Sequence, residues 1–150
     1  MNAYLWLKLL HVLAAIVAVG TNVTYFVWLR LAREPSADDA FVLNGLCALD
    51  RRLANPAYVV LPVTGIIMVL IGDIGFTTLW VAASLILFIV LGAFAGAVFT
   101  PSLKRQLQLA QTGSRGSPEY TAAAKRTTTT GVVTMVIIAA IVFFMVMKPA

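Results

Sequence analysis

Three side chains of this sequence could bind a metal ion or a haem iron: His11, Met68 and Met145. His11 is the single histidine and lies in the uncharged run between Lys8 and Arg30. Imidazole nitrogen and thioether sulfur are suitable ligands for haem iron and Cu(I). Because ionisable groups inside membranes usually have a function, His11 is a candidate ligand of haem b or copper, with Met68, Met145 or an exogenous molecule as the second ligand.

The same side chains also have ordinary structural roles, which the sequence leaves open. A buried histidine can hydrogen-bond to a carbonyl group, and methionines of an apolar chain often fill gaps in packing. The sequence has no GxGxxG after a strand, no Walker loop and no HExxH motif. Hydrolysis and phosphoryl transfer are therefore not expected, and we predict no catalytic residue.

A second set of polar residues lies within apolar runs of the chain: Asn22, Tyr25, Asn55 and Thr134. A buried amide or hydroxyl in hydrocarbon has to find hydrogen-bond partners, which favours structural contacts between helices. The alternative is that Asn22 and its neighbours line the path of a small transporter or channel. His11 and Asn22 are eleven residues apart and so share one face of a helix.

The elements that must position these residues are transmembrane helices. The chain is 61% hydrophobic and 11% charged, which is too apolar for a soluble domain of 150 residues. Gaps between formal charges predict an all-α, four-transmembrane-helix bundle in a single domain, 1–150. The predicted spans are residues 4–31, 55–72, 77–100 and 118–147.

A short amphipathic helix is expected at residues 37–53, between the first two spans. Pro35 ends the first helix, and Ser36 is a suitable N-cap for the next one. The apolar face of this helix predicts that it lies along the inner membrane surface, with packing in solvent as the alternative. Asn55-Pro56 is expected to break it and to begin the second span.

Small residues indicate where helices approach each other closely. Gly92 and Gly96 form a small-xxx-small pair in the third span. Ala15 and Ala18 lie on the face of the first helix that also carries His11 and Asn22. We expect all four small residues at helix contacts.

We interpret the net charge of +5 as a sign of membrane topology and not of nucleic-acid binding. We therefore predict no nucleic-acid partner. Nine of the eleven basic residues flank two connections, so these connections are predicted to face the cytoplasm and both termini to face outward from the inner (plasma) membrane. The nine are Arg30, Arg33, Arg51, Arg52, Lys104, Arg105, Arg115, Lys125 and Arg126. The single cysteine, Cys47, excludes an intrachain disulfide.

The chain resembles, over nearly its whole length, a family of small bacterial integral membrane proteins of unknown function, number 2269 among the domains of unknown function. The resemblance rests on the segments Leu7-Lys8-Leu9-Leu10-His11-Val12-Leu13, Gly20-Thr21-Asn22-Val23 with Trp28, Leu49-Asp50-Arg51 before Asn55-Pro56, Pro118-Glu119-Tyr120 and Met145-Val146-Met147-Lys148-Pro149. That family looks like a distant relative of copper-resistance D proteins and of haem-binding membrane proteins linked to protoporphyrinogen oxidation. From those relatives the resemblance carries over one residue, His11, as a ligand.

Three hypotheses about function follow. The first is a non-enzymatic membrane protein that serves as an accessory or assembly subunit, with the lipid bilayer and either a second copy or a larger membrane complex as partners. The second is a haem b or copper redox protein that uses His11. The third is a small transporter or channel.

Overall fold

The computed structural model describes residues 3–149, and their regular structure is helical throughout. Residues 1, 2 and 150 of the predicted domain lie outside that range. The elements are α1 (Ala3–Leu31), α2 (Asp39–Leu49), η1 (Asp50–Ala54), α3 (Asn55–Ile71), α4 (Leu79–Phe94), η2 (Ala95–Phe99), α5 (Thr100–Gln111) and α6 (Pro118–Met147), where η marks a π-helical turn.

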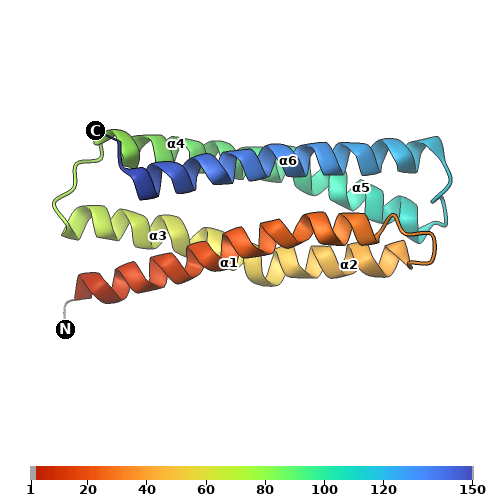
Figure 1. Ribbon diagram of the computed structural model, residues 1–150, viewed down its shortest axis with the longest axis horizontal. Coiled ribbons are helices and arrows are strands. Elements are labelled where there is room, and N and C mark those ends of the chain that lie inside the picture. Colours follow the sequence, from red (N-terminus) through yellow and green to blue (C-terminus); the bar gives the residue numbers. More distant parts are fainter. Residues whose placement is uncertain (1–2, 150) are drawn as a thin grey trace.

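These elements make four long helices arranged as two hairpins (Figure 1). The first hairpin is α1 against the continuous run α2–η1–α3, and the second is the continuous run α4–η2–α5 against α6. All four helices are long and apolar enough to cross a membrane. Large apolar side chains on their outer faces are exposed, among them Ile16, Val59, Ile89 and Val136. The prediction of an all-α, four-helix membrane protein is confirmed.

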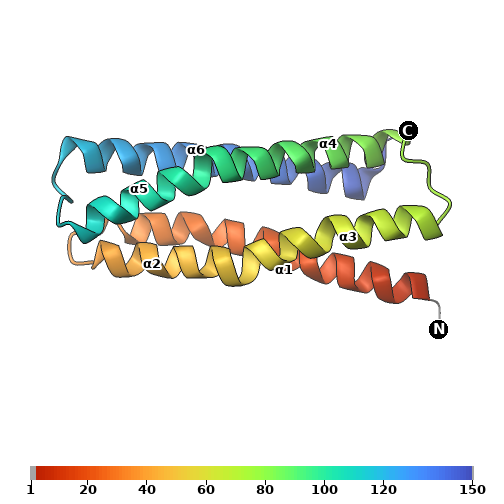
Figure 2. The ribbon, with the colours of Figure 1, turned by 180° about the vertical axis from the view of Figure 1, so that it is seen from behind.

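The two continuous runs are longer than a membrane requires. Each has 33 residues, or about 50 Å of helix, against a hydrocarbon core of about 30 Å. One end of the molecule, here called the two-loop end, carries the connections at residues 32–38 and 112–117; the opposite end, the termini end, carries both termini (Figures 1 and 2). A buried apolar cluster at the two-loop end includes Leu43, Leu46, Leu103 and Tyr120. The helices therefore form a packed bundle beyond the length that a bilayer covers.

The predicted break at Asn55-Pro56 is wrong, because the helix continues through this point in a π-helical turn. Pro56 has no N–H to donate and its ring crowds the carbonyl one turn back. The backbone N–H of Asn55 donates instead to the carbonyl of Asp50, five residues earlier. The same device recurs before Pro101, where the N–H of Thr100 donates to the carbonyl of Ala95. Each continuous run thus contains one π-helical turn directly before a polar residue and a proline.

The helix α2 exists as predicted, but it does not turn to lie across the bundle. It continues the direction of α3 and packs against α1 and α5 (Figure 2). Leu43 and Leu46, on its apolar face, are fully buried by these neighbours. The N-cap is Asp38 rather than the expected Ser36, because the Asp38 side chain accepts from the N–H of Phe41 at 3.0 Å. The apolar face of α2 thus serves the bundle and not a membrane surface.

Three aromatic or imidazole rings of α1 lie against glycines of the neighbouring run. A Cβ on Gly45 would stand 2.9 Å from the ring of Trp28, and one on Gly65 would stand 3.3 Å from the ring of His11. A Cβ on Gly72 would likewise stand 3.2 Å from the ring of Tyr4. Because these glycines have no side chains, α1 can pack closely against the run α2–η1–α3.

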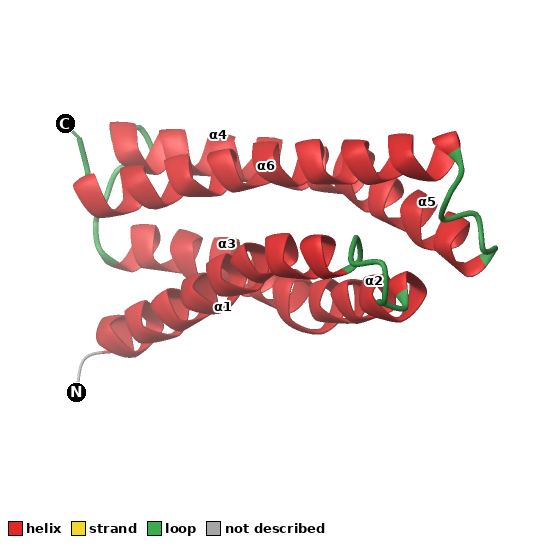
Figure 3. Cartoon of the chain, turned by 45° about the vertical axis from the view of Figure 1, so that its right-hand side comes forward, coloured by secondary structure: helices red, strands yellow, loops and turns green. Residues whose placement is uncertain are grey.

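The two connections at the two-loop end are joined by Arg115. Its guanidinium donates to the carbonyls of Ala37 at 2.7 Å, Ala32 at 3.2 Å and Glu34. These carbonyls follow the end of α1, where helical partners are missing. Arg115 of the second hairpin thus holds the connection at residues 32–38 of the first hairpin. To bring the two connections together, α5 bends from the line of α4 toward α2 (Figure 3).

Candidate functional site

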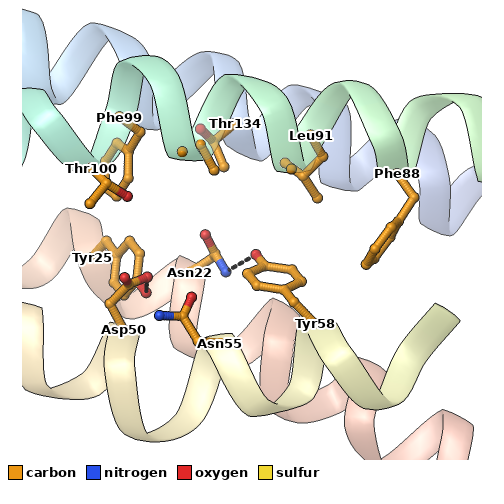
Figure 4. A pocket seen from close by; sticks show the side chains of 13 residues that line it. Asn22, Tyr25, Asp50, Asn55, Tyr58, Phe88, Leu91, Phe99, Thr100 and Thr134 are labelled. Atoms are coloured by element: carbon orange, nitrogen blue, oxygen red, sulfur yellow. Dashed lines mark hydrogen bonds between the residues drawn. The ribbon is translucent and has the colours of Figure 1, made fainter. Parts of the chain in front are cut away.

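A cavity of about 340 Å³ lies between the two hairpins, and we call it the inter-hairpin cavity. The first hairpin lines it with residues of α1, η1 and α3, and the second with residues of α4, η2, α5 and α6 (Figure 4). Both π-helical turns border it, through Asp50 on one side and Ala95, Gly96 and Phe99 on the other. Such turns are rare in proteins and are frequent at functional sites.

Asn22 and Tyr58 form the centre of the polar wall on the first hairpin. The side-chain nitrogen of Asn22 donates to the carbonyl of Ala18 at 2.8 Å and to the hydroxyl of Tyr58 at 2.5 Å (Figure 4). Asn22 is only 5% exposed. Both of its amide protons are therefore engaged, and its carbonyl oxygen is left to accept a hydrogen bond from a further donor.

Tyr25 and Asp50 form the part of this wall nearer the two-loop end. The Tyr25 hydroxyl donates to one carboxylate oxygen of Asp50 at 2.7 Å and so joins α1 to η1. Asp50 is the first residue of η1, the π-helical turn through which the helix continues into α3. The second carboxylate oxygen gives the cavity an acceptor with a negative charge.

Two aromatic pairs connect the hairpins on either side of the polar wall. Tyr25 of α1 stacks on Phe99 of η2, with ring centroids 5.8 Å apart and planes at 1°. Tyr58 of α3 meets Phe88 of α4 edge to face, with centroids 6.2 Å apart. The first pair lies toward the two-loop end and the second toward the termini end, with the polar wall between them (Figure 4).

The facing wall, on the second hairpin, is made of small and apolar residues with two hydroxyls, those of Thr100 and Thr134. A Cβ on Gly92 or on Gly96 would have no atom within 4 Å, so these glycines border open space and not the close helix contact that their spacing predicts. Thr134 of α6 donates its hydroxyl proton to the carbonyl of Thr130 at 2.9 Å, within its own helix. Its oxygen retains lone pairs that can accept a hydrogen bond.

His11 lies apart from the cavity, between α1 and α3. Its Nδ1 is 2.8 Å from the hydroxyl oxygen of Thr64, which itself donates to the carbonyl of Val60 at 2.7 Å. A hydroxyl has one proton, so Nδ1–H of His11 is the donor and Nε2 carries the lone pair. This hydrogen bond joins the two helices of the first hairpin.

The other candidate ligands, Met68 and Met145, lie on two different helices. Met68 follows Thr64 by one turn on α3, whereas Met145 lies on α6 in the other hairpin. Within residues 3–149, no three His, Cys, Asp or Glu side chains form a group that could hold a metal ion. The polar contact that the structure gives His11 is its interhelical hydrogen bond to Thr64.

The structure brings together the four polar residues that the sequence singled out, since Asn22, Tyr25, Asn55 and Thr134 all line the inter-hairpin cavity. Of the small residues on α1, Ala18 is buried and Ala15 is half-buried. The sequence analysis missed Asp50 and Tyr58 as members of this site. Their positions near Asn55 could have identified them, because Asp50 precedes Asn55 by five residues and Tyr58 follows it by three.

One family model matches the chain over residues 5–149, and its description is "Predicted integral membrane protein (DUF2269)". Comparison with curated proteins and comparison with solved structures gave no match.

Proposed function

The chain belongs to the DUF2269 family of predicted integral membrane proteins, and on that premise we propose that it is a small membrane carrier whose substrate site is the inter-hairpin cavity. One observation carries the proposal. Polar side chains from distant parts of the chain, Asn22, Asp50 and Tyr58, meet at one cavity between helices that cross a membrane. Polar groups inside a membrane are costly to keep and usually mark a path or binding site for a substrate.

The arrangement of helices supports a carrier more than a static scaffold. Helices pack along their length within each hairpin. The contacts between the hairpins include those of α2 with α5 and of α1 with α6, the two aromatic pairs, the hydrogen bonds of Arg115 to the first connection, and the hydrogen bond of Arg33 to Thr128. A movement of one hairpin against the other would open the cavity at one aromatic pair while the other stays closed. This is the rigid-body rocking by which carriers expose one site to each side in turn.

The direction of the molecule in its membrane follows from its basic residues. We propose that the two-loop end faces the cytoplasm across the plasma membrane and that both termini face outward. Reporter fusions after Lys148 and at Arg115 test this orientation. A cytoplasmic signal after Lys148 with an external signal at Arg115 would reverse it.

Thiol labelling tests the carrier proposal directly. In a Cys47→Ser background, Gly92→Cys places a thiol in the cavity, where a new Cβ has no atom within 4 Å. We expect a membrane-impermeant maleimide to label it from either side of sealed vesicles. The matched control is Ile89→Cys, one turn earlier on α4 with a side chain that is 70% exposed on the lipid-facing surface. This thiol should resist the same reagent.

The outcomes separate the three hypotheses about function. Labelling of Gly92→Cys from neither side would remove the carrier proposal and favour the accessory-subunit hypothesis, which co-purification of a stoichiometric partner or a second copy would then support. Labelling from one side would indicate a fixed binding pocket. A Soret band in the purified protein that is lost in His11→Gln would favour the haem hypothesis.

A further inference from the structure

The chemistry of the inter-hairpin cavity also indicates what it binds. We infer that its ligand is an organic ammonium ion, a cation that carries N–H donors and an apolar body. This inference rests on the proposed function and adds the substrate class.

The formal charge of the cavity is negative. Of the described residues that line it, Asp50 is the one with a carboxyl side chain, and the lining includes no lysine, arginine or histidine. The neighbouring Arg51 and Arg52 are exposed on the surface of η1, and neither lines the cavity. An anion would therefore meet the Asp50 carboxylate, while a cation would gain a charge-assisted hydrogen bond.

Several hydrogen-bonding groups of the cavity offer only acceptors to a ligand, whereas Asn55, Tyr58 and Thr100 also line the cavity and carry protons of their own. Asn22 uses both amide protons on Ala18 and Tyr58, and Thr134 uses its proton on Thr130. The Tyr25 hydroxyl uses its proton on Asp50. The carbonyl oxygen of Asn22, the Thr134 oxygen and the second oxygen of Asp50 can each accept a proton from a ligand. Together with the carboxylate of Asp50, these acceptors favour a ligand with several N–H groups.

The aromatic rings suit the same ligand. Tyr25, Tyr58, Phe88 and Phe99 all line the cavity. Ring faces attract organic cations, and the attraction is larger where water is excluded. Since the Tyr25 hydroxyl donates to a carboxylate, the ring of this tyrosine is also richer in electrons. Beyond the polar wall, Phe88 and Leu91 provide apolar surface for the body of the ligand.

Binding of three matched compounds tests the inference. Phenethylammonium, 2-phenylethanol and phenylacetate share a phenyl ring on a two-carbon chain or its acid equivalent, and they are cationic, neutral and anionic, respectively. Calorimetric titration into the full chain in nanodiscs, with empty nanodiscs subtracted, should show binding of phenethylammonium. Affinity for 2-phenylethanol should be about tenfold or more weaker, since its hydroxyl can donate to Asp50 but lacks the positive charge that strengthens this hydrogen bond. Phenylacetate should not bind.

Variants locate the interaction. Asp50→Asn should weaken phenethylammonium binding about tenfold or more and leave 2-phenylethanol unchanged, because an asparagine oxygen can still accept from Tyr25. Tyr25→Phe keeps the carboxylate and should keep the preference for the cation. Asp73→Asn, in an exposed connection, is the matched charge control and should have no effect.

Other results would overturn the inference in distinguishable ways. If 2-phenylethanol or phenylacetate bound as tightly as the cation and Gly92→Leu abolished that binding, the cavity would remain a binding site but the ammonium class would be wrong. If phenethylammonium bound equally well to Gly92→Leu or Asp50→Asn, the cation would bind elsewhere. If none of the three compounds bound, the inference would fail, while thiol labelling would still decide the carrier proposal separately.

Discussion

The side-chain nitrogen of Asn22 lies 2.5 Å from the hydroxyl oxygen of Tyr58, and this contact joins α1 to α3 at the inter-hairpin cavity. The ring of Tyr58 also packs edge to face on Phe88 of α4. One residue of α3 therefore connects the polar wall of the first hairpin with the apolar wall of the second. The strength of this contact bears on both folding and function.

A double-mutant cycle measures the hydrogen bond between Asn22 and Tyr58. We expect Asn22→Leu and Tyr58→Phe to be coupled by about 0.6 to 2 kcal/mol, the range measured for interhelical hydrogen bonds in membranes. Reversible unfolding in mixed micelles gives the four free energies. Thr24→Val, which removes a hydroxyl that bonds only within α1, should show no coupling with Tyr58→Phe. A coupling near zero for the Asn22 pair would mean that the amide serves a ligand alone.

Substitution of His11 separates its structural role from a ligand role. Glutamine can donate to Thr64 in place of Nδ1, so His11→Gln should fold normally, whereas His11→Leu should lose about 0.5 to 1.5 kcal/mol of stability. Purified wild-type protein from cells supplied with iron and copper should contain only traces of either metal. Stoichiometric metal that disappears in a folded His11→Gln protein would instead make His11 a ligand.

The contact of Gly45 with Trp28 predicts a position-specific effect of a single methyl group. Gly45→Ala places a Cβ 2.9 Å from the indole ring and should cost about 1 to 3 kcal/mol, as overpacking does in well-packed sites. Gly20→Ala is the matched control, because its Cβ would have no atom within 4 Å. It should be neutral or stabilising by up to about 1 kcal/mol, since alanine favours helix over glycine. Equal effects of the two changes would contradict the packing described for α1.

Loss of Arg115 should loosen the two-loop end. Arg115→Ala removes donors from three carbonyls of the first connection, and we expect a loss of about 1 to 3 kcal/mol in unfolding experiments. Arg115→Lys should recover only part of it, because an ammonium group lacks the planar fork of a guanidinium. Arg105→Ala, at an exposed position on α5, controls for the change in net charge. If Arg115→Ala were as stable as Arg105→Ala, apolar packing alone would hold the two connections together.

The sequence predicts the four helices well because uncharged runs of membrane length have few alternatives. It does not predict the path through Asn55-Pro56. The rule that proline ends a helix concerns the hydrogen bond one turn back, and it does not reveal that an N–H can reach the carbonyl five residues earlier. For a similar reason, the sequence analysis predicts that α2 lies on a membrane surface. The residues that bury its apolar face belong to α1 and α5, and the local sequence of α2 does not reveal them.

The sequence also predicts some residues of the candidate site and not others. Asn22, Tyr25, Asn55 and Thr134 stand out because polar side chains are rare in apolar runs. Asp50 does not, since among arginines it resembles the polar face of a surface helix. The spacing of Gly92 and Gly96 predicts close packing, but whether a second helix or a cavity faces them depends on how the two hairpins meet, which no local pattern encodes.

The most direct test of the carrier proposal is a distance measurement between the hairpins. Spin labels at Leu70→Cys of α3 and Phe143→Cys of α6, both exposed side chains, report on the termini end in a Cys47→Ser background. Pulsed electron–electron resonance on the protein in nanodiscs should give two distance populations, and Gly92→Leu should change their ratio because it fills the cavity between the hairpins. A label pair within the first hairpin, Leu5→Cys with Leu70→Cys, should give one population that Gly92→Leu does not alter. A single narrow distance between the hairpins, the same in both proteins, would contradict the proposal that they move to open the inter-hairpin cavity.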